Sequence, residues 1–273
     1  MRAEAFAPAK INLTLHVTGQ REDGYHLLDS LVAFADVGDR LGFTPGSELS
    51  LSVTGEFSDG VPTDHRNLVW QAAEAAGWTG HIHLDKHLPH GGGVGGGSSD
   101  AAAILRLLMQ QGIEIPPHIP LSLGADVPVC MHSASARMRG IGEQIEAITL
   151  PTLPALLVNP GIAAPTGAVF TAMKIRDHLP MPDNIPELKT PETCADWLQD
   201  QRNDLEGPAC TVAGAIAGVL DELSETRDVL LARMSGSGST CFALYPTAKA
   251  AHFAAYEVGA AHPEWWCHAT LLS

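Results

Sequence analysis

Residues 89–99 carry the side chains and spacing best suited to chemistry. Six glycines and one valine run from Gly91 to Gly97, and residues without a Cβ let an anion approach main-chain N–H groups. Ser98 or Ser99 can cap the helix predicted by the apolar residues of 101–109, and such a helix start attracts phosphate. A flexible glycine linker usually continues into polar residues. The pattern therefore predicts a phosphate-binding loop.

Common phosphate-loop patterns fit this segment poorly. Residues 91–96 satisfy the dinucleotide pattern G-x-G-x-x-G, but residues 81–85 before them alternate like a half-exposed antiparallel strand. The Walker pattern needs Lys where this chain has Ser98, and no H-R-D or D-F-G triplet of protein kinases follows. The pattern P-x-G-G-G-x-G-G-G-S-S instead resembles the phosphate loop of the GHMP small-molecule kinases.

The composition indicates a soluble globular protein. The 273 residues are 45% hydrophobic, enough for one large or two modest domains. No apolar stretch could span a bilayer and residues 1–10 lack a secretory signal, so we expect a cytoplasmic protein without a membrane partner. Five scattered cysteines without a C-x-x-C pair indicate reduced thiols. The net charge of -15 argues against nucleic acid and favours a divalent metal at any polyphosphate site.

Periodicity predicts a mixture of strands and helices. Strands are expected at residues 7–17, 49–53, 81–85, 156–158 and 241–244, with an apolar stretch at 27–37 and strand and turn at 135–148. Helices are expected at 67–76, after the glycine loop, and at 204–223, whereas residues 176–192 indicate an exposed loop. The prolines of 150–154 suggest a boundary between domains of residues 1–150 and 151–273.

Further motifs narrow the resemblance to one branch of the GHMP kinases. PAKINL at residues 8–13, DGYH at 23–26, LGADVP at 123–128, NDLE at 203–206 and MSGSGS at 234–239 are similar to kinases that phosphorylate 4-diphosphocytidyl-2-C-methyl-D-erythritol for isoprenoid synthesis by the non-mevalonate pathway. The match covers nearly the whole chain. It implies an α+β fold with an N-terminal domain like domain 2 of ribosomal protein S5, a C-terminal ferredoxin-like domain and an active site in the cleft between them. ATP and Mg²⁺ are the implied cofactors, and the 2-hydroxyl is the acceptor.

The resemblance assigns Lys10 and Asp126 to catalysis. Phosphoryl transfer needs an aligned hydroxyl, neutralised charge and a proton acceptor. We expect Asp126 to accept the proton of the hydroxyl while Lys10 holds both this carboxylate and the incoming phosphate oxygen. From the residues alone, Asp126 could be a turn residue bonded to its own backbone. Lys10 lies among apolar residues and needs a partner, because an unpaired ammonium is costly to bury.

The resemblance also assigns two binding sites. In the first, Tyr25 stacks on the cytosine and His26 hydrogen-bonds to it; the substrate residues are Asn12, Tyr25, His26, Thr166 and Phe170. Asn67 and Lys86 align with groups around the base and ribose of ATP. The remaining ATP residues are Pro89, His90, Gly91, Gly92, Gly93, Val94, Gly95, Gly96, Gly97, Ser98 and Ser99. Ser98 or Ser99 could also reach Mg²⁺, but no acidic metal ligand is identified.

Several alternatives stay open at this point. Tyr25 and Phe170 could be ordinary packed aromatics, while Asn67 could start a helix and Lys86 end a strand at the surface. Two residues depart from the family pattern: His90 replaces an apolar residue, and Asp100 would repel polyphosphate unless it points away or faces the metal. The H-x-x-x-H spacing at residues 83–87 falls on a strand, where it does not converge on zinc.

The rival functions are another GHMP kinase, of homoserine or mevalonate type, and a nucleotide-binding module without transfer activity. A homoserine or mevalonate kinase has a substrate without a base, so it has no use for the ring of Tyr25. A binding module without transfer activity predicts the loss of Lys10 or Asp126, and both residues are present. The expected partners are ATP and the cytidine diphosphate substrate, with the chain as a monomer or homodimer.

Overall fold

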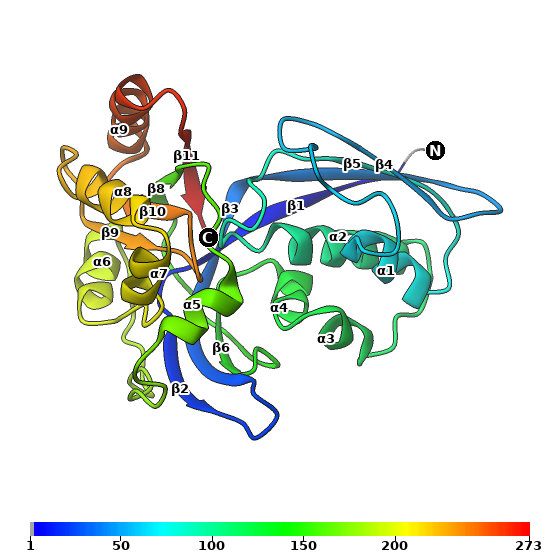
Figure 1. The fold of residues 1–273 in the computed structure, drawn as a ribbon, viewed down its shortest axis with the longest axis horizontal. Coiled ribbons are helices and arrows are strands. Elements are labelled where there is room, and N and C mark those ends of the chain that lie inside the picture. Colours follow the sequence, from blue (N-terminus) through cyan, green and yellow to red (C-terminus); the bar gives the residue numbers. More distant parts are fainter. Residues whose placement is uncertain (1–2) are drawn as a thin grey trace. The chain divides into compact units, whose positions relative to one another are not determined.

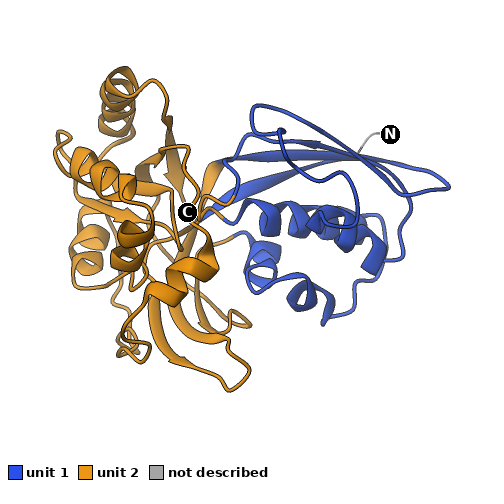
Figure 2. Ribbon diagram, in the orientation of Figure 1, with its two compact units in different colours: residues 1–10, 37–90, 95–133 blue, residues 11–36, 91–94, 134–273 orange. Residues whose placement is uncertain are grey.

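The computed structural model describes residues 3–273, which form two compact units (Figures 1 and 2). Unit 1 takes the described part of residues 1–10 together with residues 37–90 and 95–133, and unit 2 takes residues 11–36, 91–94 and 134–273. Both units are discontinuous in sequence, because the strands β1 (Ala3–Asn12) and β3 (His26–Pro45) each pass from one unit into the other. The compact units therefore differ from the expected segments 1–150 and 151–273.

Unit 1 is a sheet with helices on one side (Figure 1). Within this unit β3 pairs with β1 and with the antiparallel strand β5 (Gly80–Asp85), which is in turn parallel to β4 (Ser50–Thr54). Its helices are α1 (Leu68–Ala75), α2 (Gly96–Gln110), α3 (Ile119–Leu123) and α4 (Val127–His132). The other three helices contact α2, whose residues 99–105 are all buried. This enclosure fixes the start of α2, where the glycine loop ends.

Unit 2 is built on antiparallel strands. The first half of β3 pairs with β2 (His16–Gln20) and β6 (Ala136–Gly140), and β6 pairs with β7 (Gln144–Ala147). The order continues from β3 through β11 (Trp266–Leu272), β8 (Leu153–Asn159), β10 (Cys241–Leu244) and β9 (Leu231–Met234). The helices are α5 (Thr166–Ala172), α6 (Pro191–Gln199), α7 (Glu206–Val212), α8 (Ala215–Ser224) and α9 (Ala248–Ala261).

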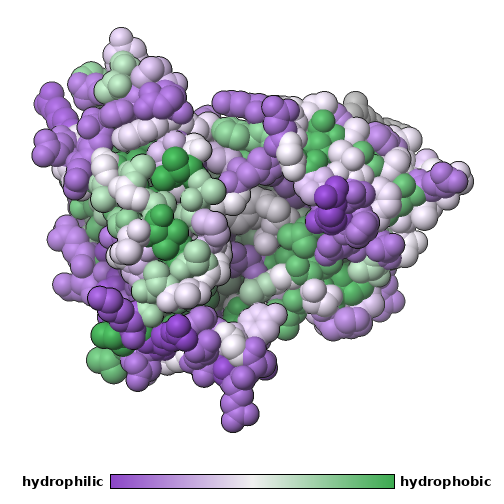
Figure 3. Space-filling view, in the orientation of Figure 1, coloured by the Kyte–Doolittle hydropathy of each residue, from purple (hydrophilic) through white to green (hydrophobic). Residues whose placement is uncertain are grey.

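Apolar packing holds the sheet of unit 2. Strand β8 is buried along its whole length, and its Leu156 and Val158 share a core with Val169 of α5, Ile216 of α8 and Val258 of α9. Hydrophobic residues also reach the surface, where Figure 3 shows them among hydrophilic ones on the viewed face of unit 2. Scattered exposure of this kind is ordinary for a folded protein.

Most expected elements are present, with four differences. The strand expected at 7–17 is interrupted after Asn12, and the helix expected at 204–223 is two helices that meet at Ala213 and Gly214. Helix α2 starts at Gly96 without a side-chain cap, so capping by Ser98 or Ser99 is wrong. The periodicity did not predict five helices and two strands that the structure contains, namely α3, α4, α5, α6, α9, β9 and β11.

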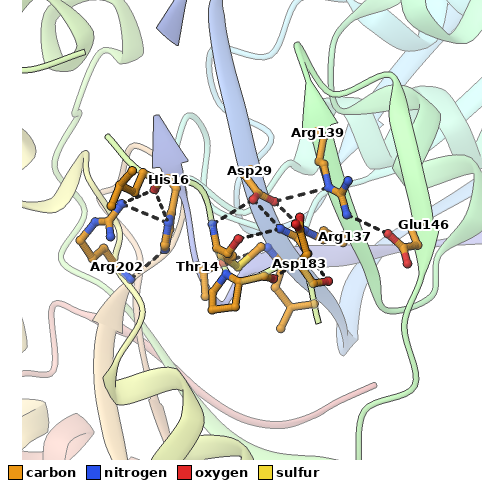
Figure 4. Close-up of polar contacts among 12 residues, drawn as sticks. Thr14, His16, Asp29, Arg137, Arg139, Glu146, Asp183 and Arg202 are labelled. Carbon is orange, nitrogen blue, oxygen red and sulfur yellow. Dashed lines mark hydrogen bonds and ion pairs between the residues drawn. The ribbon is translucent and has the colours of Figure 1, made fainter. Parts of the chain in front are cut away.

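A buried ion pair fastens the segment that the sequence presents as an exposed loop (Figure 4). Arg137 is 1% exposed and donates to both carboxylate oxygens of Asp29, at 2.8 and 2.6 Å. It also donates to the carbonyl oxygens of Met181, Pro182 and Asp183, while the Met181 N–H donates to Asp29. Residues 176–190 lack helix and strand and most of them are exposed, as expected, but Met181 is buried. The loop is held here because Asp29 of β3 and Arg137 of β6 are charges that are costly to bury without each other, and the loop backbone hydrogen-bonds to both.

We expect Arg137→Ala to lower the free energy of unfolding by about 3–5 kcal/mol, because it leaves the Asp29 carboxylate buried without its partner. Urea denaturation measures the change. The control is Arg66→Ala, which breaks an exposed pair with Asp64 and should change the free energy of unfolding far less, because water screens that pair. Equal losses of unfolding free energy in the two variants would show that the buried pair stabilises the fold no more than the exposed pair.

Candidate active site

Lys10 and Asp126 lie side by side in unit 1. The Lys10 Nζ atom is 2.9 Å from the Asp126 Oδ2 atom. Lys10 is 3% exposed because its neighbours in β1, Ala9 and Ile11, are buried, whereas the Asp126 side chain is 36% exposed. Asp126 precedes α4, but its carboxylate makes no hydrogen bond that caps this helix. The expected meeting of these side chains is therefore a feature of the structure, and their catalytic roles stay a prediction.

The phosphate loop requires glycine at particular positions. Gly91, Gly93 and Gly95 have φ values of 58°, 74° and 63°, in the left-handed region that other residues avoid. A Cβ on Gly93 would also overlap the Ser235 backbone, and one on Gly95 would lie 3.2 Å from the Lys10 Cβ. The backbone at Gly95 thus packs directly on the Lys10 side chain. Neighbouring positions differ in exposure, since Pro89 and Val94 are buried and His90 is exposed.

The first turn of α2 is fastened to β1. The fully buried Ser99 hydroxyl donates to the Pro8 carbonyl oxygen at 2.7 Å. This bond holds the first turn of α2 against Pro8, which lies two residues before Lys10 in β1. Ser98 is half-buried, and its Oγ lies 3.9 Å from where a Cβ would stand on Gly124, in the turn that leads to Asp126. The helix start, the ammonium and the carboxylate therefore belong to one region of unit 1.

A second glycine turn, the motif MSGSGS, contacts the phosphate loop within unit 2. The Ser235 hydroxyl donates to the Gly93 carbonyl oxygen at 2.8 Å, and the Thr240 N–H donates to that of Gly92 at 2.9 Å. The Asn203 side chain donates to two carbonyl oxygens of the turn, at 2.8 and 2.9 Å. The motifs NDLE and MSGSGS thus brace the loop, a role that their sequences alone did not indicate.

His26 and Phe170 form an aromatic stack in unit 2. Their ring centroids are 4.3 Å apart and their planes differ by 16°. Burial, and then the positive charge of Arg176, lower the pKa of His26 below its ordinary value. The His26 Nε2 atom is buried and has no hydrogen-bond partner within the described chain. Tyr25 is 58% exposed, so its packing as a half-buried aromatic is wrong and its ring is open to a ligand.

Asn12 and Thr166 also belong to unit 2, where the side chain of each makes one hydrogen bond. The Asn12 amide nitrogen donates to the Ser30 hydroxyl at 2.8 Å, while its buried Oδ1 has no partner among residues 3–273. The Thr166 hydroxyl, at the start of α5, is 2.8 Å from that of Ser237. The Asn12 oxygen is therefore an acceptor that a ligand could satisfy.

Asn67 and Lys86 are both engaged in contacts within unit 1. The Asn67 side-chain oxygen, Oδ1, accepts from the Val69 N–H and caps α1, and the side-chain nitrogen, Nδ2, donates to the Pro62 carbonyl oxygen. Lys86 is 4% exposed and forms ion pairs with Asp39 and Asp100, so its placement as a surface residue is wrong. Asp39 was not singled out from the sequence, although a carboxylate inside an apolar strand is a detectable signal. A contact of either residue with ATP stays a prediction.

The described residues contain no group of three or more His, Cys, Asp or Glu side chains that could hold a metal ion. The five cysteines are free, as expected. Across residues 3–273, no helix has both the length and the hydropathy needed to cross a bilayer.

Comparisons with known proteins agree on one family. Residues 67–142 match the GHMP kinases N terminal domain and residues 190–264 match the GHMP kinases C terminal domain. The chain is 54% identical to 4-diphosphocytidyl-2-C-methyl-D-erythritol kinase of Dinoroseobacter shibae, over 98% of this chain and 94% of that protein. Identity to the kinase of the same name from Cereibacter sphaeroides is 52%, over 96% of both chains.

Solved structures give the same result. A crystal structure of 4-(cytidine 5'-diphospho)-2C-methyl-D-erythritol kinase matches with a TM-score of 0.77 and 34% identity, covering 99% of both chains. Homoserine kinase from Cytophaga hutchinsonii has a TM-score of 0.66 at 16% identity, over 98% of this chain and 94% of that one, and so shares the fold. The expected two-domain α+β fold is confirmed. The chain belongs to the 4-diphosphocytidyl-2-C-methyl-D-erythritol kinase family of the GHMP kinases.

Proposed function

We propose that this chain transfers the γ-phosphoryl group of ATP to the 2-hydroxyl of 4-diphosphocytidyl-2-C-methyl-D-erythritol, with Lys10 and Asp126 as the catalytic pair. The names of its relatives supply the substrate. The observation that carries the mechanism is the 2.9 Å ion pair between these residues, beside the helix start that follows the glycine loop. A binding module that had lost transfer activity would have no reason to keep this pair.

The two residues take complementary parts in the transfer. The Asp126 carboxylate accepts the proton of the 2-hydroxyl as the oxygen–phosphorus bond forms, and the bond between the γ-phosphorus and the β-bridging oxygen breaks to leave ADP. The ammonium of Lys10 holds the carboxylate in place and faces the negative charge of the transferred group. Because Lys10 is buried, this charge acts where water screens it little.

The His26 and Phe170 stack supports recognition of the cytidine. Since the pKa of His26 is lowered, its imidazole is neutral at pH 7 and offers one donor and one acceptor nitrogen. Stacking tolerates any base, so a hydrogen bond from His26 would select cytosine. The open Tyr25 ring would cover the base, while Asn12 and Thr166 supply further polar contacts.

The nucleotide would lie along the glycine loop. Its N–H groups and the start of α2 suit phosphate oxygens, and Mg²⁺ would neutralise charge on the polyphosphate. The helix start offers few protein groups that could bind a magnesium ion directly. The Ser99 hydroxyl is buried and donates to Pro8, so Ser98 is the serine whose hydroxyl is accessible there. Magnesium commonly keeps its waters and binds mainly through substrate phosphates.

We also propose a cytoplasmic enzyme, monomeric or homodimeric, without nucleic-acid or membrane partners. The net charge of -15 supports the absence of nucleic acid. A division into family domains of residues 1–150 and 151–273 is supported by the two family models, which match on either side of residue 150.

Asp126→Asn should lower kcat by about 10²- to 10⁴-fold, because an amide cannot take the hydroxyl proton, with little change in the KM for ATP. ADP release from ATP, Mg²⁺ and the cytidine substrate measures it. The matched control is Asp64→Asn, at an exposed carboxylate. Unchanged turnover of Asp126→Asn would remove this residue from the mechanism.

Tyr25→Ala should raise the KM for the cytidine substrate by about 5- to 150-fold, the range that corresponds to one stacking contact. Tyr25→Phe keeps the ring and should stay close to the wild type in the same steady-state assay. An unchanged KM in the alanine variant would place the base elsewhere.

Gly95→Ala should raise the KM for ATP, because a Cβ strains a left-handed residue and also presses on the Lys10 side chain. Gly112→Ala provides the control: its φ of 84° is equally left-handed, but a Cβ there meets nothing within 4 Å. Both variants should lose about 1–2 kcal/mol of stability, measured by urea denaturation. An equal change in the KM for ATP in both variants would show that backbone strain, and not contact with Lys10, causes the effect of Gly95→Ala.

A further inference from the structure

Three buried charged side chains meet in unit 1, next to the two ends of the phosphate loop. Asp39 of β3 is 0% exposed, Lys86 after β5 is 4% exposed, and Asp100 of α2 is 2% exposed. The Lys86 Nζ atom forms an ion pair with the Asp100 Oδ2 atom at 2.8 Å and another with the Asp39 Oδ2 atom. One ammonium thus joins two carboxylates that come from distant parts of the chain.

This cluster, which we call the Asp39–Lys86–Asp100 triad, holds both ends of the phosphate loop. The Asp39 Oδ1 atom accepts the backbone N–H groups of His87 at 2.6 Å and Leu88 at 2.9 Å, immediately before the loop. Asp100 follows Ser99, immediately after it. The entry and the exit of residues 89–99 are therefore tied through the same carboxylate and ammonium.

The burial of the triad leaves Lys86 little freedom to act on a ligand. A nucleotide that contacted its ammonium would have to displace a carboxylate and leave it buried without a partner, which is costly. Burial penalises the Lys86 charge, but the two neighbouring carboxylates outweigh it and raise the pKa of Lys86. Burial raises the pKa of Asp100 while the Lys86 ammonium opposes this rise, and the Asp100 Oδ1 atom has no hydrogen-bond partner within the described chain.

A loop rich in glycine has a particular need for fixed ends. Glycine loses more conformational freedom on ordering than any other residue, and that loss opposes phosphate binding if the loop orders only when ATP arrives. Tied ends limit the conformations open to the free loop, so less freedom is lost on binding.

We propose that Asp39, Lys86 and Asp100 are positioning residues that hold the phosphate loop ready for ATP, and that Lys86 does not contact the nucleotide. The proposal rests on the proposed kinase function and replaces the sequence-based assignment of Lys86 to the ATP base and ribose. Asp100, which the sequence presents as a threat to polyphosphate, points instead at Lys86.

The test compares Asp39→Asn, Lys86→Met and the double variant Lys86→Met/Asp100→Asn. Each single variant should raise both the KM for ATP and its calorimetric Kd by about tenfold or more, while the KM for the cytidine substrate stays within about twofold. The double variant should bind ATP better than Lys86→Met, because Asp100→Asn leaves one buried acidic group without its cation instead of two. Preference for ATP over GTP should not change.

The control is Leu107→Ala, in the buried far half of α2, which should lower the melting temperature without changing the Kd for ATP. An effect of Lys86→Met without one of Asp39→Asn, or altered preference for GTP, would overturn the proposal in favour of direct contact. Equal Kd values for ATP in all variants would also overturn it. If Lys86→Met fails to fold, Asp39→Asn and the double variant decide by the same Kd. A wild-type chain that binds ATP but releases no ADP would contradict the kinase function alone.

Discussion

The structure depends above all on the ion pair between Lys10 and Asp126. Lys10 stands between the buried apolar residues Ala9 and Ile11, so the ammonium is stable there only with a partner. That partner comes from the turn before α4, more than a hundred residues along the chain. The requirement to pair one buried charge therefore fixes the position of the turn that presents the more exposed carboxylate.

The same physical device recurs away from this pair. The chain has only 16 lysines and arginines against 31 acidic residues, and several of these cations are buried in ion pairs. Arg137 with Asp29 fastens residues 181–183, and Lys86 with Asp39 and Asp100 fastens the phosphate loop. In both places a charge that is costly to bury alone holds a segment that lacks regular secondary structure. Scarce cations are thus used to order loops, in addition to any contact with phosphate.

Local patterns were enough for much of the fold. The alternation at residues 81–85 predicts β5, and the apolar residues of 101–109 predict the helix after the glycine loop. Long-range partners were harder. Nothing near Lys86 in the sequence reveals Asp39, which lies 47 residues earlier, and nothing near Arg137 reveals its contact with Met181. The predicted serine capping of α2 was also wrong, because the helix already starts at Gly96, and the Ser99 hydroxyl donates instead to the Pro8 carbonyl oxygen of β1.

The most direct test is a crystal structure of the chain with a non-hydrolysable ATP analogue, Mg²⁺ and the cytidine substrate. We predict that an Asp126 carboxylate oxygen lies within about 2.6–3.2 Å of the substrate 2-hydroxyl. We also predict that the Lys10 ammonium lies within hydrogen-bond distance of a γ-phosphate oxygen. A 2-hydroxyl bound by other residues, with the Lys10 and Asp126 pair remote from the γ-phosphate, would contradict it.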